Sequence, residues 1–90
     1  MPDQRVVLID TGALHHVVGL DGDGADRNAV LAEFDERAGR GELFVIPVTA
    51  IIETGNHIAP SSGDRRLMAE RLVGVIRAAQ GDDPPWIIRA

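Results

Sequence analysis

Two acidic residues, Asp10 and Glu53, are each placed just after a hydrophobic run and could together hold a metal ion. Asp10 directly follows the aliphatic run at residues 6–9, and Glu53 lies about one turn into a helix expected after a second run at residues 43–46. Because the carboxyl ends of parallel strands share one edge of a sheet, we expect the two carboxylates to converge there. Like charges brought close are costly unless a cation lies between them, so the pattern predicts a Mg²⁺ or Mn²⁺ site with oxygen ligands.

Both acids also have a structural interpretation that needs no ligand. Aspartate is a common helix N-cap, so Asp10 could simply cap the helix expected after it. Glu53 could be a solvated residue on the exposed side of an amphipathic helix. The sequence leaves both interpretations open beside the metal site.

The hydrophobic pattern predicts the elements that position these residues. The continuous apolar runs at residues 6–9 and 43–46 are typical of parallel strands that are buried on both faces. We expect helices at residues 13–18, 27–38, 50–58 and 64–80, and a short third strand starting at Trp86. Asp26 and Thr49 are the N-caps expected for the second and third helices. Strands that alternate with helical segments predict an α/β fold with a parallel sheet.

Length and composition limit the classes of protein that remain. The 90 residues make a single domain, and the absence of cysteine excludes a disulfide scaffold and a thiol nucleophile. Nine basic and fourteen acidic residues give a net charge of −5, which argues against a broad basic surface for nucleic acid. No apolar run approaches the roughly 20 residues of a membrane span, and no signal-peptide core follows the N-terminus. We therefore expect a soluble, cytoplasmic protein with no membrane association.

The segments VVLIDTGALHHVVG and LFVIPVTAIIETGNHIA together resemble the front half of a PIN-domain nuclease. The resemblance implies an α/β, PIN-like three-layer sandwich with a short parallel sheet. It implies that Asp10 and Glu53 are catalytic acids that bind Mg²⁺ or Mn²⁺, with Thr11 as the supporting hydroxyl beside the first acid. The implied function is that of a metal-dependent ribonuclease acting on RNA. Many PIN proteins are toxins, so a cognate antitoxin or another protein partner is also implied.

The chain departs from the PIN pattern after residue 80. The family brings further aspartates from later strand–helix junctions, whereas Asp82 and Asp83 precede the last strand and lie at its wrong end. We therefore expect residues 1–90 to form one PIN-like domain that is truncated at its C-terminus and holds half of the acidic site. Such a chain is either a ribonuclease whose site is completed elsewhere or an inactive remnant.

A different class of function is a non-catalytic interaction module. The short sheet is expected to leave an unpaired edge near residues 86–88 and to leave apolar helix faces uncovered. Surfaces of this kind recruit other chains, so the pattern predicts a homo-oligomer or a module that completes a partner.

A lesser alternative starts from Asp-Thr-Gly-Ala at residues 10–13, which resembles the active-site loop of retroviral-type aspartic proteases. Those proteases dimerise so that two aspartates share a proton. Their fold is almost entirely β, however, and this chain has at least two strong amphipathic helices and no flap hairpin. The strong helices therefore weigh against a protease.

Histidine and arginine residues provide weaker signals. His57 follows Glu53 by four residues and shares its helical face, so it could contact a metal or an RNA phosphate, or simply lie at the surface. His15 and His16 are adjacent on a helix and point about 100° apart, so they cannot easily bind one ion together. Arg65, Arg66 and Arg71 form a modest basic patch that is expected to be a solvated helix face.

Overall fold

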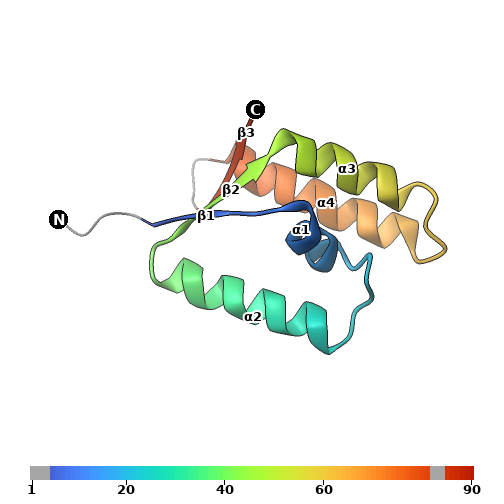
Figure 1. The fold of residues 1–90 in the computed structure, drawn as a ribbon, viewed down its shortest axis with the longest axis horizontal. Coiled ribbons are helices and arrows are strands. Elements are labelled where there is room, and N and C mark those ends of the chain that lie inside the picture. The colour runs from blue at the N-terminus through green and yellow to red at the C-terminus, as the bar shows by residue number, and fades with distance from the viewer. Residues whose placement is uncertain (1–4, 82–84) are drawn as a thin grey trace.

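The computed structural model describes residues 5–81 and 85–90, and these form three strands and four helices (Figure 1). In chain order they are β1 (Val6–Leu8), α1 (Thr11–Val18), α2 (Ala25–Gly39), β2 (Leu43–Pro47), α3 (Val48–Ile58), α4 (Arg65–Gln80) and β3 (Trp86–Arg89). The predicted α/β class is confirmed, and each predicted element is present within a few residues of its expected ends.

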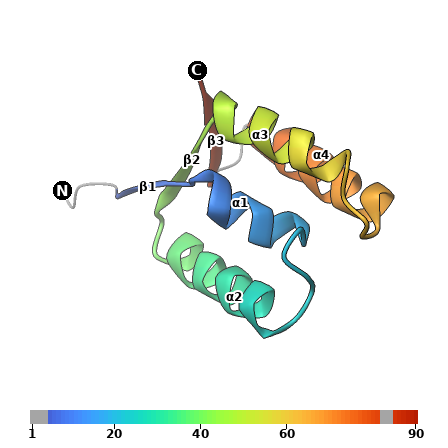
Figure 2. The same ribbon diagram turned by 45° about the vertical axis from the view of Figure 1, so that its right-hand side comes forward.

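The sheet is parallel and its strands lie in chain order, with β2 between β1 and β3. Each crossover therefore steps to the next strand in the same direction. Crossovers between parallel strands are right-handed in nearly all proteins, so two steps in one direction place both pairs of helices on the same face. Figure 2 shows the helices gathered on one side of the strands.

The covered face of the sheet carries the hydrophobic core. Phe44 and Ile46 alternate along β2, and each is at most 1% exposed. Phe44 packs with Phe34 of α2 and Trp86 of β3, and the three ring centroids are 5.1 to 5.7 Å apart. Every helix adds buried residues to the same cluster, namely Leu14, Val17, Val18, Phe34, Ala50, Ile58, Met68, Leu72 and Val75. One core thus joins all four helices to one face of the sheet.

The opposite face of the sheet carries apolar side chains outside this core. Val6 and Leu8 of β1 are 61% and 67% exposed. The strand register places these two residues beside Leu43, Val45 and Ile87, whose side chains point to the same face. None of the five belongs to the buried core or to the partly buried residues packed against it. We call these five residues the bare face.

The bare face corrects two predictions. Neither apolar run forms a strand that is buried on both faces, because Val6 and Leu8 of β1 and Leu43 and Val45 of β2 lie on the bare face. The strand β1 is an edge strand, and Ile9, which follows it, is 1% exposed and joins the core. The third layer that the PIN resemblance implies is not formed by residues 5–81 and 85–90. Both errors have one cause, which is that the strand order cannot be read from the apolar runs. An apolar run shows that a strand could be buried on both faces, but the order of the strands decides which faces other elements cover.

Two predicted helix caps are also wrong. The helix α2 begins at Ala25 with Gly24 as its N-cap, and Asp26 lies inside the first turn, where its charge favours the helix dipole. The strand β2 leads directly into α3, so Pro47 is the N-cap and Thr49 is already helical. By contrast, Asp10 and Asp64 cap α1 and α4 through their side chains.

Candidate functional site

Asp10 connects the end of β1 to the start of α1. Its backbone is extended (φ −78°, ψ 172°), and its Oδ1 accepts a hydrogen bond of 2.7 Å from the backbone N–H of Ala13. The structural interpretation of Asp10 as a cap is therefore correct. The carboxylate remains exposed, and its Oδ2 has no hydrogen bond to any other described residue. Capping thus holds the side chain in place and leaves one oxygen open to a ligand.

Glu53 comes to this edge of the sheet from α3. Its side chain is exposed, and its Oε2 accepts a hydrogen bond of 2.9 Å from the Thr11 hydroxyl. This bond joins residues 42 positions apart in the chain, and Thr11 is the direct neighbour of Asp10. The start of α1 therefore contacts the middle of α3, with the Thr11 hydroxyl against Glu53. We call Asp10, Thr11 and Glu53 the edge cluster.

The helices α1 and α3 run side by side in the same direction. One turn beyond the Thr11–Glu53 bond, the rings of His15 and His57 meet edge to face, with centroids 5.0 Å apart. Both contacts advance by four residues on each helix, which is one helical turn. The interface between α1 and α3 thus has a polar end at the edge cluster and a histidine pair one turn away.

The edge cluster has no positive partner within the described part of the chain. No arginine forms an ion pair or a hydrogen bond with Asp10 or Glu53, whereas all the ion pairs lie elsewhere. Among residues 5–81 and 85–90, no three histidine or acidic side chains are grouped so that they could hold a metal ion together. The cluster therefore offers two carboxylates and one hydroxyl.

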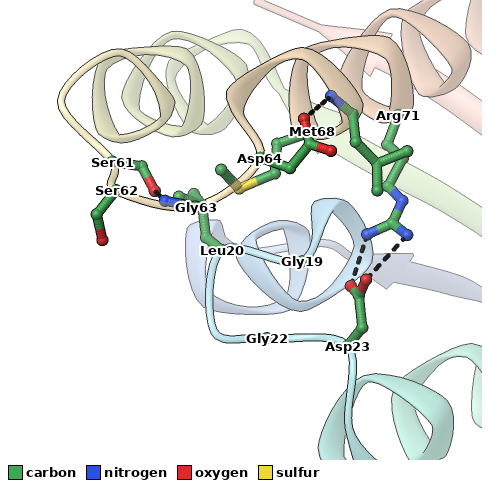
Figure 3. Close-up of a pocket in the computed structure, with 11 residues that line it drawn as sticks. Gly19, Leu20, Gly22, Asp23, Ser61, Ser62, Gly63, Asp64, Met68 and Arg71 are labelled. Carbon is green, nitrogen blue, oxygen red and sulfur yellow. Dashed lines mark hydrogen bonds and ion pairs between the residues drawn. The ribbon is translucent and has the colours of Figure 1, made fainter.

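The three arginines that the sequence predicted to form a solvated face of α4 each have a partner within the described part of the chain. Arg71 forms an ion pair with Asp23 through bonds of 2.7 and 3.3 Å and also donates to the Val18 carbonyl (Figure 3). The hydrogen bond from Arg71 holds the pKa of Asp23 below its ordinary value. Arg66 pairs with Glu70 at 3.2 Å, and Arg65 donates to the carbonyl of residue 59. The three arginines thus serve the fold.

The ion pair of Arg71 requires glycine at the end of α1. Gly19 has a φ of +88°, and a Cβ at this position would fall 2.5 Å from the Arg71 guanidinium and 2.6 Å from the Asp23 carboxylate. Figure 3 shows Arg71 reaching from α4 to Asp23 in the loop after α1, and both residues line a pocket of about 330 Å³. This contact closes the loop onto α4.

The histidine pair is the feature that the sequence interpretation missed. His15 was set aside because it cannot share an ion with His16, and His57 was considered only with Glu53. The available signal was the equal four-residue spacing of Thr11 to His15 and Glu53 to His57. That spacing brings the two rings together only if α1 and α3 lie side by side with Thr11 level with Glu53. The relative position of two helices cannot be read from the sequence.

Two further predictions concern the aspartic protease alternative and the acids Asp82 and Asp83. The aspartic protease alternative requires an almost entirely β fold, whereas the segment after Asp10 is helical and four helices cover the sheet. Asp82 and Asp83, which were excluded as site residues, lie outside the described residues. The edge cluster therefore remains the candidate site.

No protein-family model, curated protein or solved structure matches this chain. Among the described helices, none combines the length and the apolar character needed to cross a membrane.

Proposed function

We propose that the edge cluster is one wall of the metal site of a PIN-type ribonuclease. The observation that carries this proposal is the 2.9 Å bond between Thr11 and Glu53, which joins the first residue of α1 to the middle of α3, the two helices that follow neighbouring parallel strands. Ligands of open α/β sheets bind at this edge. The proposal includes the PIN-like three-layer arrangement, whose second helical layer would cover the bare face.

The donor set of the edge cluster fits a hard divalent cation. Mg²⁺ and Mn²⁺ prefer oxygen ligands, and Mg²⁺ is commonly held by one or two carboxylates with water and substrate phosphates as the other ligands. Asp10 is held by its bond to Ala13 and Glu53 by its bond to Thr11, so both carboxylates are oriented before a cation arrives. A bound ion of this kind would supply an activated water and stabilise charge on an RNA phosphate.

The proposed site needs more acids than the described residues provide. A partner chain is one source for them, and a cognate antitoxin or another protein is the kind of partner that the PIN resemblance implies. Asp10, Glu53 and Thr11 would then position the ion from one side only. Activity of the 90 residues is accordingly expected to depend on what completes the site.

The first test measures cleavage of single-stranded RNA in Mn²⁺ by the wild-type chain, Asp10→Asn and Glu53→Gln. We expect both substitutions to abolish cleavage, because each removes one charge from the ion's ligands. Asp35→Asn is the matched control, since Asp35 is an exposed acid on α2 that does not belong to the edge cluster. Cleavage that survives both substitutions would reject the site.

A companion measurement remains informative if the isolated chain does not cleave RNA. Mn²⁺ is paramagnetic and broadens NMR signals near its binding site. We expect broadening at the amides around residues 10–13 and 53, which disappears in Asp10→Asn. Broadening that is unchanged by this substitution would contradict metal binding at the edge cluster.

A second candidate function is a protein-interaction module, and the bare face favours it. Exposed apolar patches that are contiguous mark interaction surfaces, and β1 also presents an unpaired backbone edge beside this patch. We infer that the occupant is a second copy of the chain, in keeping with the predicted homo-oligomer. Two copies would cover each other's bare faces.

Sedimentation velocity over a micromolar concentration series tests this inference. We expect a dimer of the wild-type chain that Leu8→Glu converts to a monomer, because the substitution places a charge at the most exposed residue of the bare face. Ile52→Glu is the matched control, since Ile52 is 55% exposed on α3, away from the bare face. A compact monomer at every concentration would count against the module.

A further inference from the structure

The histidine pair lies beside a hollow that the edge cluster does not use. His15 of α1 and His57 of α3 line a pocket of about 320 Å³, together with Asp21 and residues 60–62. The pocket lies one helical turn from the Thr11–Glu53 bond, at the opposite end of the α1–α3 contact. Its location makes it a separate site.

Neither imidazole has a hydrogen-bond partner within the described part of the chain. The Nε2 atom of His15 is buried and unpaired, which is uncommon for a polar atom in a folded protein. His57 is exposed, so its ring can rotate without disturbing the core. The pair therefore offers nitrogen atoms that the fold itself does not use.

The separation of the two rings suits a shared metal ion. Two imidazoles bound to one tetrahedral Zn²⁺, each with a Zn–N distance of about 2.0–2.1 Å, have ring centroids roughly 5 Å apart. The observed centroid separation is 5.0 Å. Imidazole nitrogen is a ligand for Zn²⁺, Cu²⁺ and Ni²⁺, whereas Mg²⁺ and Ca²⁺ prefer oxygen.

The charge of the pocket also favours a cation over a phosphate. Asp21 is the charged residue among those that line it, and no arginine lines it. A phosphate bound between the histidines would lie close to this carboxylate without a fixed positive partner. A metal ion would instead gain from it.

We propose that His15 and His57 bind a single late transition-metal ion, with Zn²⁺ as the reference ion. Asp21, whose Oδ2 lies 3.9 Å from the Nδ1 of His16, contributes its charge to the pocket, and water completes the coordination. This site is independent of the proposed ribonuclease, because it takes a different class of metal through nitrogen ligands on other residues.

The test follows the imidazole signals of the chain by NMR during titration with Zn²⁺ in buffer that contains excess Mg²⁺. The sequence has three histidines, and His16, which lies 3.9 Å from Asp21 but does not line the pocket, serves as an internal reference for a ring that is not a ligand. We expect the His15 and His57 signals to shift together and to saturate at one equivalent of Zn²⁺, with His16 unchanged. Equal shifts at all three rings, or no shift, would overturn the proposal.

Variants then assign the ligands by isothermal titration with Zn²⁺. We expect His57→Gln and His15→Gln each to weaken binding by about tenfold or more, since loss of even a supporting partner of a ligand costs that much. His16→Gln is the matched control and should bind Zn²⁺ as the wild-type chain does. Because His57 is exposed, His57→Gln is expected to fold, so unchanged affinity in this variant would reject the site.

The double variant Asp10→Asn/Glu53→Gln separates this proposal from the ribonuclease. We expect it to lose Mn²⁺ binding at the edge cluster and to keep Zn²⁺ binding at the histidine pair. Zn²⁺ affinity that falls with the two acids, and not with the histidines, would show that the ion binds at the edge cluster and would overturn the separate site.

Discussion

Glu42 and Glu53 lie beyond opposite ends of β2, and the surrounding chain treats their carboxylates in opposite ways. Glu42 is only 4% exposed, and it accepts hydrogen bonds of 3.0 Å from Arg37 and 2.9 Å from Arg40. Glu53 is exposed and accepts one hydrogen bond, from the neutral hydroxyl of Thr11. One carboxylate is neutralised within the chain, and the other is not.

The contrast extends to the neighbours of both residues. Arg37 also forms an ion pair with Glu33, and Arg40 forms one with Glu36, each at 2.9 Å. Negative and positive side chains therefore alternate around Glu42. At the other end of the strand, Asp10 adds a second negative charge near Glu53 without an arginine. A charge that the fold balances serves stability, whereas two unbalanced charges at one edge are available to an external cation.

The largest expected effect is on the stability of the folded chain when Glu42 loses its charge. We call Glu42 and its two arginine partners, Arg37 and Arg40, the balanced end of β2. Glu42→Gln removes the charge that holds two arginines together in a buried position, so we expect a clear fall in the thermal midpoint. Glu53→Gln keeps an acceptor for Thr11 in an exposed position, and its free energy of unfolding should change by less than about 0.5 kcal/mol. Calorimetry of both variants makes the comparison. An equal fall for the two would remove the distinction between these carboxylates.

The balanced end should also make stability depend on pH. Hydrogen bonds from Arg40 and Arg37 lower the pKa of Glu42 in the folded chain, although burial opposes them. The group therefore adds stability at pH values above the ordinary glutamate pKa of about 4.3, and this contribution is lost as the pH falls through the lower folded pKa. Urea unfolding between neutral and acid pH should show this loss, and Glu42→Gln should flatten the curve. A variant curve parallel to the wild type would assign the acid sensitivity to other groups, Asp23 among them.

The smallest expected effect separates the two roles of Asp10. Asp10→Ala removes the cap of α1 and should cost about 1 kcal/mol, whereas asparagine caps about as well as aspartate and should cost only a few tenths. Asp10→Asn therefore removes the charge and keeps the cap. Chemical denaturation of the two variants checks this order. An asparagine variant as unstable as the alanine variant would mean that the negative charge itself supports the fold.

The local elements of this fold could be predicted from the sequence. The aliphatic runs locate the strands, and Asp10 and Asp64 mark the starts of two helices, because these signals act over a few residues. The rule that the ends of parallel strands share an edge predicted that Asp10 and Glu53 converge, whereas the bond between Thr11 and Glu53 was not itself predicted. These predictions needed no knowledge of how the sheet is covered.

The features that the sequence did not show depend on relations between distant elements. The exposure of Leu8 depends on the strand order, which the pattern of apolar residues does not contain. The contact between His15 and His57 depends on the register of two helices. The burial of Glu42 depends on two arginines at the end of α2 that reach back over it. In each case the residue types allowed several outcomes, and the packing selected one.

The bare face also affects how the folded state would look to a common laboratory dye. Fluorescent dyes such as ANS bind exposed apolar surface, and their staining is usually taken as a sign of a molten globule. A chain whose native sheet presents Val6 and Leu8 to solvent offers such a surface while its core is intact. Dye staining of this protein would therefore report the uncovered sheet, and loss of near-ultraviolet circular dichroism would be the better sign that the core has loosened.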